Sequence, residues 1–463
     1  MSNQEPPCYG TLNKVSTQDL SADDKAGPSK KFSTRELIAL IAICLTHMGD
    51  AVEIYLPSIL TQNISCEMKL GDFEQGILSM VFYSFYAAGS FSSGWFANHM
   101  GQRKTIILSL TLSFLVSTLA ALSHEFYMLL ASRAATGALV GSNYGITNIF
   151  WCTTSTDTKI KNFGLFLASL CFSLGAGYTS IMAFCILDVI GWRMFFVISS
   201  LPLYIFPLLA FILYLRDGDS PIKPNTNLEN QRSQTSKPEL VGDDVMSEEA
   251  GGPQPSNQKM ENVSRSFKCL IFQLALTYLV NIAQGWGLIL FVPTVYNTQN
   301  EFLNTNSDEC NAIFGYQFLK MTLISGLGPL GAKILAYLVQ MFLPPSVLMF
   351  GSSLVSTISF LVLAFVHWGV ATAIVDVIMG IIKGAFAFLN LTLWLYMMNA
   401  FEGPARTAAT VIIDGSSKMG AILGSTAVAF LPMETVVVLM FCLGVAQSLV
   451  LTWLHFTKRC IAI

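Results

Sequence analysis

The sequence predicts an all-α polytopic membrane protein whose 12 transmembrane helices form two pseudo-symmetric six-helix bundles. Composition is the first reason: 53% of the 463 residues are hydrophobic and 12% are charged, against roughly 25% charged residues in soluble domains. The second reason is the number of apolar runs of about 20 residues, enough for 12 crossings. The third is one long polar segment, near 216–266, that divides these runs six and six.

The apolar runs set the expected order of the spans. Each is long enough to cross the roughly 30 Å hydrocarbon core as a helix. We expect the spans near 36–60, 75–97, 104–123, 126–149, 163–187, 193–215, 267–292, 318–342, 346–367, 371–398, 405–430 and 434–457.

Basic residues predict the orientation, because cytoplasmic loops carry an excess of Lys and Arg. Counted alternately, the loops that hold most of them fall on one side. We therefore expect a cytoplasmic tail at 1–35, a bundle at 36–215, a disordered cytoplasmic linker at 216–266, a second bundle at 267–457 and a cytoplasmic tail at 458–463. The polar N-terminus lacks an apolar segment with a cleavage site, so we expect no removed signal peptide.

The two halves share small-residue landmarks, as in transporters built from duplicated repeats. In the first span of each half a glycine is followed eight residues later by a proline, at Gly49 and again at Gly285. In the fifth span of each half a glycine follows a basic residue by 14 positions, at Gly175 and Gly420. These matches indicate an internal repeat.

Two acids in the first span need an explanation, because a carboxylate near the bilayer centre costs at least about 2.5 kcal/mol. Asp50 and Glu53 lie on one helical face with His47. In the second half, the position that corresponds to Asp50 is occupied by Trp286, so the fold itself does not require an acid there. Either the two acids serve a function or they lie in the wetter outer third of the span. Arg133 in the fourth span needs a carboxylate or an anion, and Asp50 is expected at a comparable depth.

The second half carries its own charges within spans. Asp414 and Lys418 are four residues apart, the spacing of a helical ion pair, and we favour a structural pair. Lys383 either binds an anion or pairs with Asp376. Trp286 either forms an aromatic wall of a binding site or faces lipid.

The loop after the second span reads 94-GWFANHMGQRKT-105 and resembles the loop signature of the major facilitator superfamily at Gly94, Gly101, Arg103 and Lys104. Asn98 replaces its aspartate, which reduces any salt bridge there to hydrogen bonds. With 49-GDAVEIYLPS-58, 191-GWRMFF-196 and 405-ARTAATVIIDGSSKMGAILG-424, nearly the whole chain resembles the branch that holds synaptic vesicle 2-related proteins and organic ion transporters. It departs from that pattern at 399-NAFEGPAR-406 and lacks the second loop signature.

The resemblance implies a secondary active transporter that moves a small polar or charged organic solute by alternating access. It implies that Asp50 and Arg133 form a proton- or ion-responsive pair. From its position in the span, Glu53 is expected to lie farther out and nearer water and to take part in coupling or substrate binding. The candidate substrate-binding residues are Glu53, Trp286, Lys383, Phe386, Asp414 and Lys418. The alternative is a non-transporting vesicle-membrane protein that binds or sorts partners.

Partners and covalent features follow from shorter motifs. Cys66 and Cys310 fall in predicted outer loops and are a possible disulfide. The stretch 9-YGTL-12 fits the pattern, from Tyr9 to Leu12, that clathrin adaptors recognise. The chain has no phosphate loop, metal-ligand cluster or nucleophile motif, so we expect no enzyme activity, no cofactor, no metal and no nucleic-acid partner. We expect a monomer, bound by lipid and its solute, in the plasma membrane or a vesicle membrane.

Overall fold

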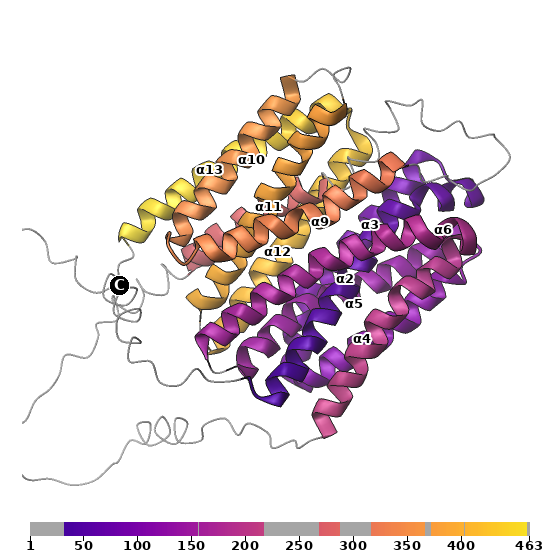
Figure 1. Ribbon diagram of the computed structural model, residues 1–463, viewed down its shortest axis with the longest axis horizontal. Coiled ribbons are helices and arrows are strands. Elements are labelled where there is room, and N and C mark those ends of the chain that lie inside the picture. Colours follow the sequence, from indigo (N-terminus) through magenta and orange to yellow (C-terminus); the bar gives the residue numbers. More distant parts are fainter. Residues whose placement is uncertain are drawn as a thin grey trace, which may run out of the picture.

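The computed structural model describes residues 32–155, 157–216, 268–287, 316–365, 372–401 and 403–460. The regular structure of these residues is helical, and a helix occupies each of the predicted spans where it is described. Figure 1 shows the long helices side by side, with the first half of the chain, α2 to α6, next to the second half, α9 to α13. An all-α membrane fold is therefore confirmed.

The helix bounds follow the apolar runs with short extensions. In the first half the helices are α2 (Thr34–Met68), α3 (Asp72–Met100), α4 (Gln102–Ala121), α5 (Phe126–Thr154) and α6 (Thr158–Arg216). The second half has an unlabelled helix, Lys268–Gly287, then α9 (Tyr316–Val339), α10 (Pro345–Phe365), α11 (Thr372–Ala400), α12 (Gly403–Phe430) and α13 (Met433–Cys460).

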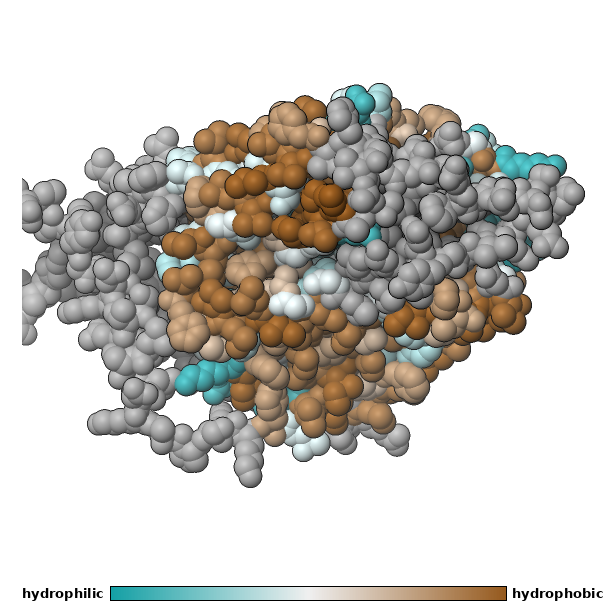
Figure 2. Space-filling view, turned by 45° about the horizontal axis from the view of Figure 1, so that its top comes forward, coloured by the Kyte–Doolittle hydropathy of each residue, from teal (hydrophilic) through white to brown (hydrophobic). Residues whose placement is uncertain are grey.

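Within the described ranges, 8 helical segments are long and apolar enough to cross a membrane. Two of them, Thr158–Leu187 and Val189–Leu213, belong to α6 and meet near Gly191. Gly191 has φ 74° and ψ 162°, a conformation that is essentially restricted to glycine. Figure 2 shows that hydrophobic residues cover much of the visible surface, as expected for helices that face lipid.

Glycines set the spacing between α3 and α5. A Cβ added at Gly137 would lie 2.4 Å from the Phe82 carbonyl oxygen, and one added at Gly141 would lie 2.1 Å from the Tyr86 carbonyl oxygen. Side chains would therefore force the two backbones apart. This is the close helix approach that small residues four apart allow in membranes.

The two repeat glycines have the same packing role. A Cβ at Gly175 of α6 would lie 2.5 Å from the carbonyl oxygen of Met48 on α2. A Cβ at Gly420 of α12 would lie 2.0 Å from the carbonyl oxygen of Leu279 on the Lys268–Gly287 helix. In each half the fifth span thus packs closely on the first, which supports the internal repeat.

The two halves meet along α3 and α12. Gly94 lies against Val411, where an added Cβ would be 2.8 Å from Cγ2, and Gly415 lies against the ring of Phe91. Nearby, Gly145 of α5 faces the carboxylate of Asp414, with 3.6 Å between Oδ2 and the position of an added Cβ. The Asp414 carboxylate of the second half therefore lies against a helix of the first half.

Candidate functional site

Arg133 pairs with Glu53, not with Asp50. Nη1 of Arg133 donates to Oε2 of Glu53 at 2.9 Å, and Nη2 donates to the Glu53 carbonyl oxygen at 2.8 Å. The side chains are 1% and 0% exposed. The expectations that Arg133 meets Asp50 and that Glu53 lies nearer water are therefore wrong, because the long arginine side chain spans the extra turn to Glu53.

The remaining carboxylate oxygen of Glu53 is also satisfied. Ser117 of α4 donates to Oε1 at 2.7 Å, and Ser200 of α6 donates to it at 2.9 Å. The Arg133 guanidinium lies 4.6 Å from the ring centroid of Phe82 and 5.5 Å from that of Phe196. Charge pairing, hydrogen bonds and cation–π contacts together stabilise this buried pair.

Asp50 is equally buried but lacks such partners. Its side chain is 0% exposed, and neither carboxylate oxygen has a hydrogen-bond partner among the described residues. The charges near enough to act on it are Lys418, Glu53 and Asp414. A buried carboxylate without hydrogen bonds is costly in its ionised form. Asp50 is therefore a group that gains from binding a proton or a cation.

Other buried polar groups without hydrogen-bond partners among the described residues lie on α2, α5 and α6. His47 packs edge-on against Tyr144, with ring centroids 4.7 Å apart, and its Nδ1 has no partner in the described part of the chain. The Tyr204 hydroxyl on α6 and the Asn143 amide on α5 are also buried without partners there. Together with Asp50 they leave the interior of the first half rich in unused hydrogen-bonding capacity.

Asp414 and Lys418 form the predicted ion pair of α12. Nζ of Lys418 lies 3.1 Å from Oδ1 of Asp414, and Ser90 of α3 donates a hydrogen bond to Oδ2. Nζ also lies 4.5 Å from the ring centroids of both Tyr86 and Tyr144. The ion pair belongs to the second half, whereas the Ser90 hydroxyl and the two tyrosine rings that contact it belong to the first half. It is therefore a charged centre shared by the two halves.

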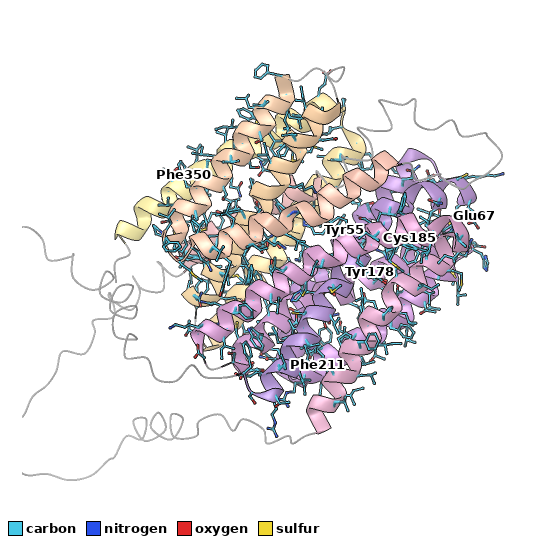
Figure 3. The ribbon with its side chains drawn as sticks, viewed as in Figure 1. Tyr55, Glu67, Tyr178, Cys185, Phe211 and Phe350 are labelled. Carbon is cyan, nitrogen blue, oxygen red and sulfur yellow. The ribbon has the colours of Figure 1, made fainter. Side chains whose placement is uncertain are left out.

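Trp286 belongs to an aromatic cluster between the halves and does not face lipid. Its side chain is 6% exposed. Its ring centroid lies 6.2 Å from that of Tyr55, 5.7 Å from that of Tyr83 and 6.5 Å from that of Phe172. Figure 3 labels Tyr55 near the boundary between the two sets of helices. The interpretation of Trp286 as an aromatic wall agrees with this position.

Lys383 bonds to backbone and not to Asp376. Its Nζ donates to the Gly285 carbonyl oxygen at 3.2 Å, which ties α11 to the Lys268–Gly287 helix. Phe386, about one turn further on, packs against Gly285, where an added Cβ would lie 2.2 Å from the ring. Lys383 is 3% exposed, so its amino group is buried, and the hydrogen-bond acceptor found for it is the neutral Gly285 carbonyl oxygen.

The loop-signature residues form a tight connection between α3 and α4. Gly101 has φ 85° and ψ 150°, a backbone conformation that favours glycine. Arg103 lies over the ring of Phe150 at 5.7 Å, and Lys104 is exposed. Asn98 is also exposed, and no side-chain hydrogen bond of Asn98 is found with the described residues. The nearby polar contact instead runs from Thr153 to Gln102, at 3.2 Å.

Three predicted features fall wholly or partly outside the described residues. Cys66 is disulfide-bonded, but Cys310 lies outside the described ranges, so the pairing stays a prediction. Tyr9 and Leu12 also lie outside them. The sorting motif is therefore untested.

An ionic clamp at the end of α2 was not predicted. Glu67 accepts hydrogen bonds from Trp192 and Arg193, which follow the α6 kink, and Nη2 of Arg193 donates to the Ser123 carbonyl oxygen at 3.0 Å. Burial raises the pKa of Glu67, but the hydrogen bonds from Arg193 and Trp192 outweigh it and leave this pKa below its usual 4.5. Figure 3 shows Glu67 at one end of the helices, well away from Tyr55.

The partners that define the site carry little sequence signal. Ser117 and Ser200 are ordinary small residues of apolar helices, and serine is common at helix contacts in membranes. Tyr86 and Tyr144 are two of 14 tyrosines. Their position is the one signal available in the sequence: Tyr86 lies on the predicted second span, and Tyr144 lies beside Gly145 on the predicted fourth span.

Comparisons with known proteins agree with this architecture. Residues 39–425 match the model of the Major Facilitator Superfamily. A Caenorhabditis elegans protein named "Putative transporter svop-1" is 25% identical over 190 residues, which cover 41% of this chain and 36% of that protein. The synaptic vesicle 2-related protein of Xenopus laevis is 22% identical over 258 residues, covering 54% of this chain and 46% of that protein.

A more distant likeness extends to the synaptic vesicle glycoprotein 2A of Rattus norvegicus. It is 24% identical over 150 residues, 32% of this chain and 20% of that protein. The matched segments span less than half the length of each of these relatives. The family model, in contrast, covers most of the chain. The chain therefore belongs to the major facilitator superfamily, as a multi-pass membrane protein.

Proposed function

We propose that the chain is a secondary active transporter that moves a small polar or charged organic solute by alternating access. The observation that carries this proposal is Asp50, a fully buried carboxylate without a hydrogen-bond partner in the described part of the chain. It lies within electrostatic reach of the Asp414–Lys418 pair, where the two halves meet. A fold that needed only packing would not keep such a costly group.

Asp50 supplies the coupling step. An uncompensated carboxylate in a dry interior takes up a proton or a cation, and it ionises when water or a positive group reaches it. Rocking of one bundle against the other changes that access. Binding and release at Asp50 therefore favour different arrangements of the two halves. Glu53 and Arg133 hold α2, α4, α5 and α6 together while this happens.

The substrate site is proposed around the shared charged centre. Lys418 and Asp414 offer both signs of charge, and the rings of Tyr86, Tyr144 and Trp286 offer flat apolar contact. Sites for organic solutes typically combine apolar walls with a few placed polar groups. We assign Lys383 and Phe386, both on α11, to the part of the proposed substrate site that the second half contributes. Both signs are present, so the solute is proposed to carry charge, of either sign.

Reconstitution tests the proposal. Proteoliposomes with an imposed pH gradient are offered a panel of radiolabelled organic cations, anions and sugars. We expect uptake of at least one solute above that of empty vesicles and dependence on the gradient. The control is Glu434→Gln, since Glu434 is an exposed acid at the start of α13. No transport of any solute by folded protein would contradict the proposal.

A second candidate is a vesicle-membrane protein that keeps the fold but binds or sorts partners. It is favoured by Asn98, which replaces the signature aspartate and makes no side-chain hydrogen bond with the described residues. It would use the adaptor-type motif from Tyr9 to Leu12. In this case the reconstituted protein moves nothing, and an immobilised peptide of residues 1–20 retains clathrin adaptor complexes unless Tyr9 is replaced by alanine.

For either function we propose the same placement in the membrane. The chain is a monomer of two bundles, 36–215 and 267–457, in the plasma membrane or a vesicle membrane. Both tails and the 216–266 linker lie in the cytoplasm, as the Lys and Arg distribution indicates. Protease added outside intact cells should not cleave the linker, and cleavage there would contradict this orientation.

A further inference from the structure

Two thiols face each other between α2 and α6. The Cys44 and Cys171 thiols are close enough to interact with each other, and neither forms a disulfide. Each lies four residues before a close helix contact, where Gly175 of α6 packs on Met48 of α2. The thiols are thus at matching heights, one turn from a contact that holds the two helices at fixed spacing.

A buried lysine from the other half lies beside this pair. Lys333 of α9 is 5% exposed. Its Nζ donates to the Ser169 carbonyl oxygen at 2.6 Å and to the Ser173 hydroxyl at 2.8 Å, both neutral acceptors on α6. Among the described groups, the one able to carry a negative charge that acts on Lys333 is the thiol of Cys171. An anionic group at Cys171 would therefore supply the missing countercharge.

We propose that Cys44 and Cys171 form a two-coordinate binding site for a soft monovalent metal cation, Cu(I), with Lys333 as its charge partner. Thiolates select soft cations of this kind. Binding replaces two thiol protons with one Cu(I), releases both protons, and leaves a bis-thiolate complex of net charge −1 without any redox change. The Lys333 ammonium offsets that charge in the buried site.

The donor set separates Cu(I) from zinc. Structural zinc sites need four ligands, and the described residues contain no group of three or more His, Cys, Asp or Glu that could hold a metal. Two opposed sulfurs are therefore suited to a cation that accepts two ligands. The site also joins both halves, since the thiols belong to α2 and α6 and the lysine to α9. Occupancy is expected to favour the arrangement in which α9 lies against α6.

A competition titration tests the site on the purified full-length protein. Cu(I), kept reduced with ascorbate, is titrated in the presence of a coloured Cu(I) chelator. We expect one equivalent per chain to be withdrawn from the chelator, and Zn(II) not to compete. Cys44→Ser and Cys171→Ser should each weaken binding at least about tenfold, and Lys333→Gln about tenfold, as charge partners of metal ligands do. The control is Cys152→Ser, a buried thiol with no cysteine partner in the described residues.

X-ray absorption of the copper-loaded wild type keeps the proposal falsifiable if a serine variant misfolds. Two sulfur ligands and no nitrogen or oxygen ligand are expected. A copper ion with nitrogen or oxygen ligands would overturn the site. Failure of the wild type to withdraw copper, or unchanged binding by the folded Cys44→Ser, Cys171→Ser double variant, would also overturn it. None of these outcomes depends on solute transport.

Discussion

Two carboxylates one turn apart on α2 have opposite surroundings. Glu53 and Asp50 are both fully buried, yet both oxygens of Glu53 are bonded, to Arg133, Ser117 and Ser200. Neither oxygen of Asp50 is bonded within the described residues. Burial alone therefore does not separate a structural acid from a functional one. The difference lies in the partners, which make ionised Glu53 stable and leave Asp50 free to change state.

The largest effect is expected when the Glu53–Arg133 pair is broken from one side. Glu53→Met leaves a buried guanidinium without its anion, and removing one partner of a buried pair typically costs about 3–5 kcal/mol. We expect a large loss of thermal stability and of folded yield, measured by fluorescence-detected size-exclusion chromatography after heating. The Glu53→Met, Arg133→Met double variant should recover much of it. Equal loss in the single and double variants would show that the pair is not the structural unit.

The Asp414–Lys418 pair should give the next largest effect. Asp414→Asn leaves the Lys418 ammonium buried without its carboxylate, but the ammonium keeps its cation–π contacts with the rings of Tyr86 and Tyr144. We therefore expect about 2 kcal/mol of destabilisation, less than for Glu53, because cation–π contacts retain part of the stabilisation. Replacing both residues, with Asp414→Asn and Lys418→Met, should be less damaging to stability than either change alone. A double variant as unstable as the worse single variant would contradict a paired role.

The smallest effect is expected at Glu67, a carboxylate that is 43% exposed. Its pKa is below 4.5 in the folded protein, so the ionised form contributes stability above about pH 4.5, and this contribution is lost as pH falls through the lower folded value. The difference in melting temperature between wild type and Glu67→Gln should thus be present at neutral pH and vanish in strong acid. A difference that persists in acid would show that neutral hydrogen bonds, not charge, hold the clamp.

The described spans could be predicted from the sequence because bilayer thickness fixes the length of a span, and an apolar run of that length reveals it whatever the surrounding packing. The sequence also predicted the Asp414–Lys418 pair, because residues four apart on a helix are neighbours whatever surrounds them. The partner of Arg133 could not be chosen this way. Asp50 and Glu53 differ by about 4.5 Å in height, a difference that the arginine side chain can span. The choice depends on helix rotation and on Ser117 and Ser200, which only the packed structure places.

Asp50 supplies the most direct test of the central claim that the unpartnered acid, not the paired one, couples ions to movement. Asp50→Asn keeps the size of the side chain but cannot ionise. It should fold with wild-type or higher thermal stability, because it replaces a buried acid that is costly when ionised with a neutral amide. In proteoliposomes with a pH gradient, the variant should lose gradient-driven uptake of the solute while retaining exchange across the membrane. Normal gradient-driven uptake by folded Asp50→Asn protein would contradict the coupling role.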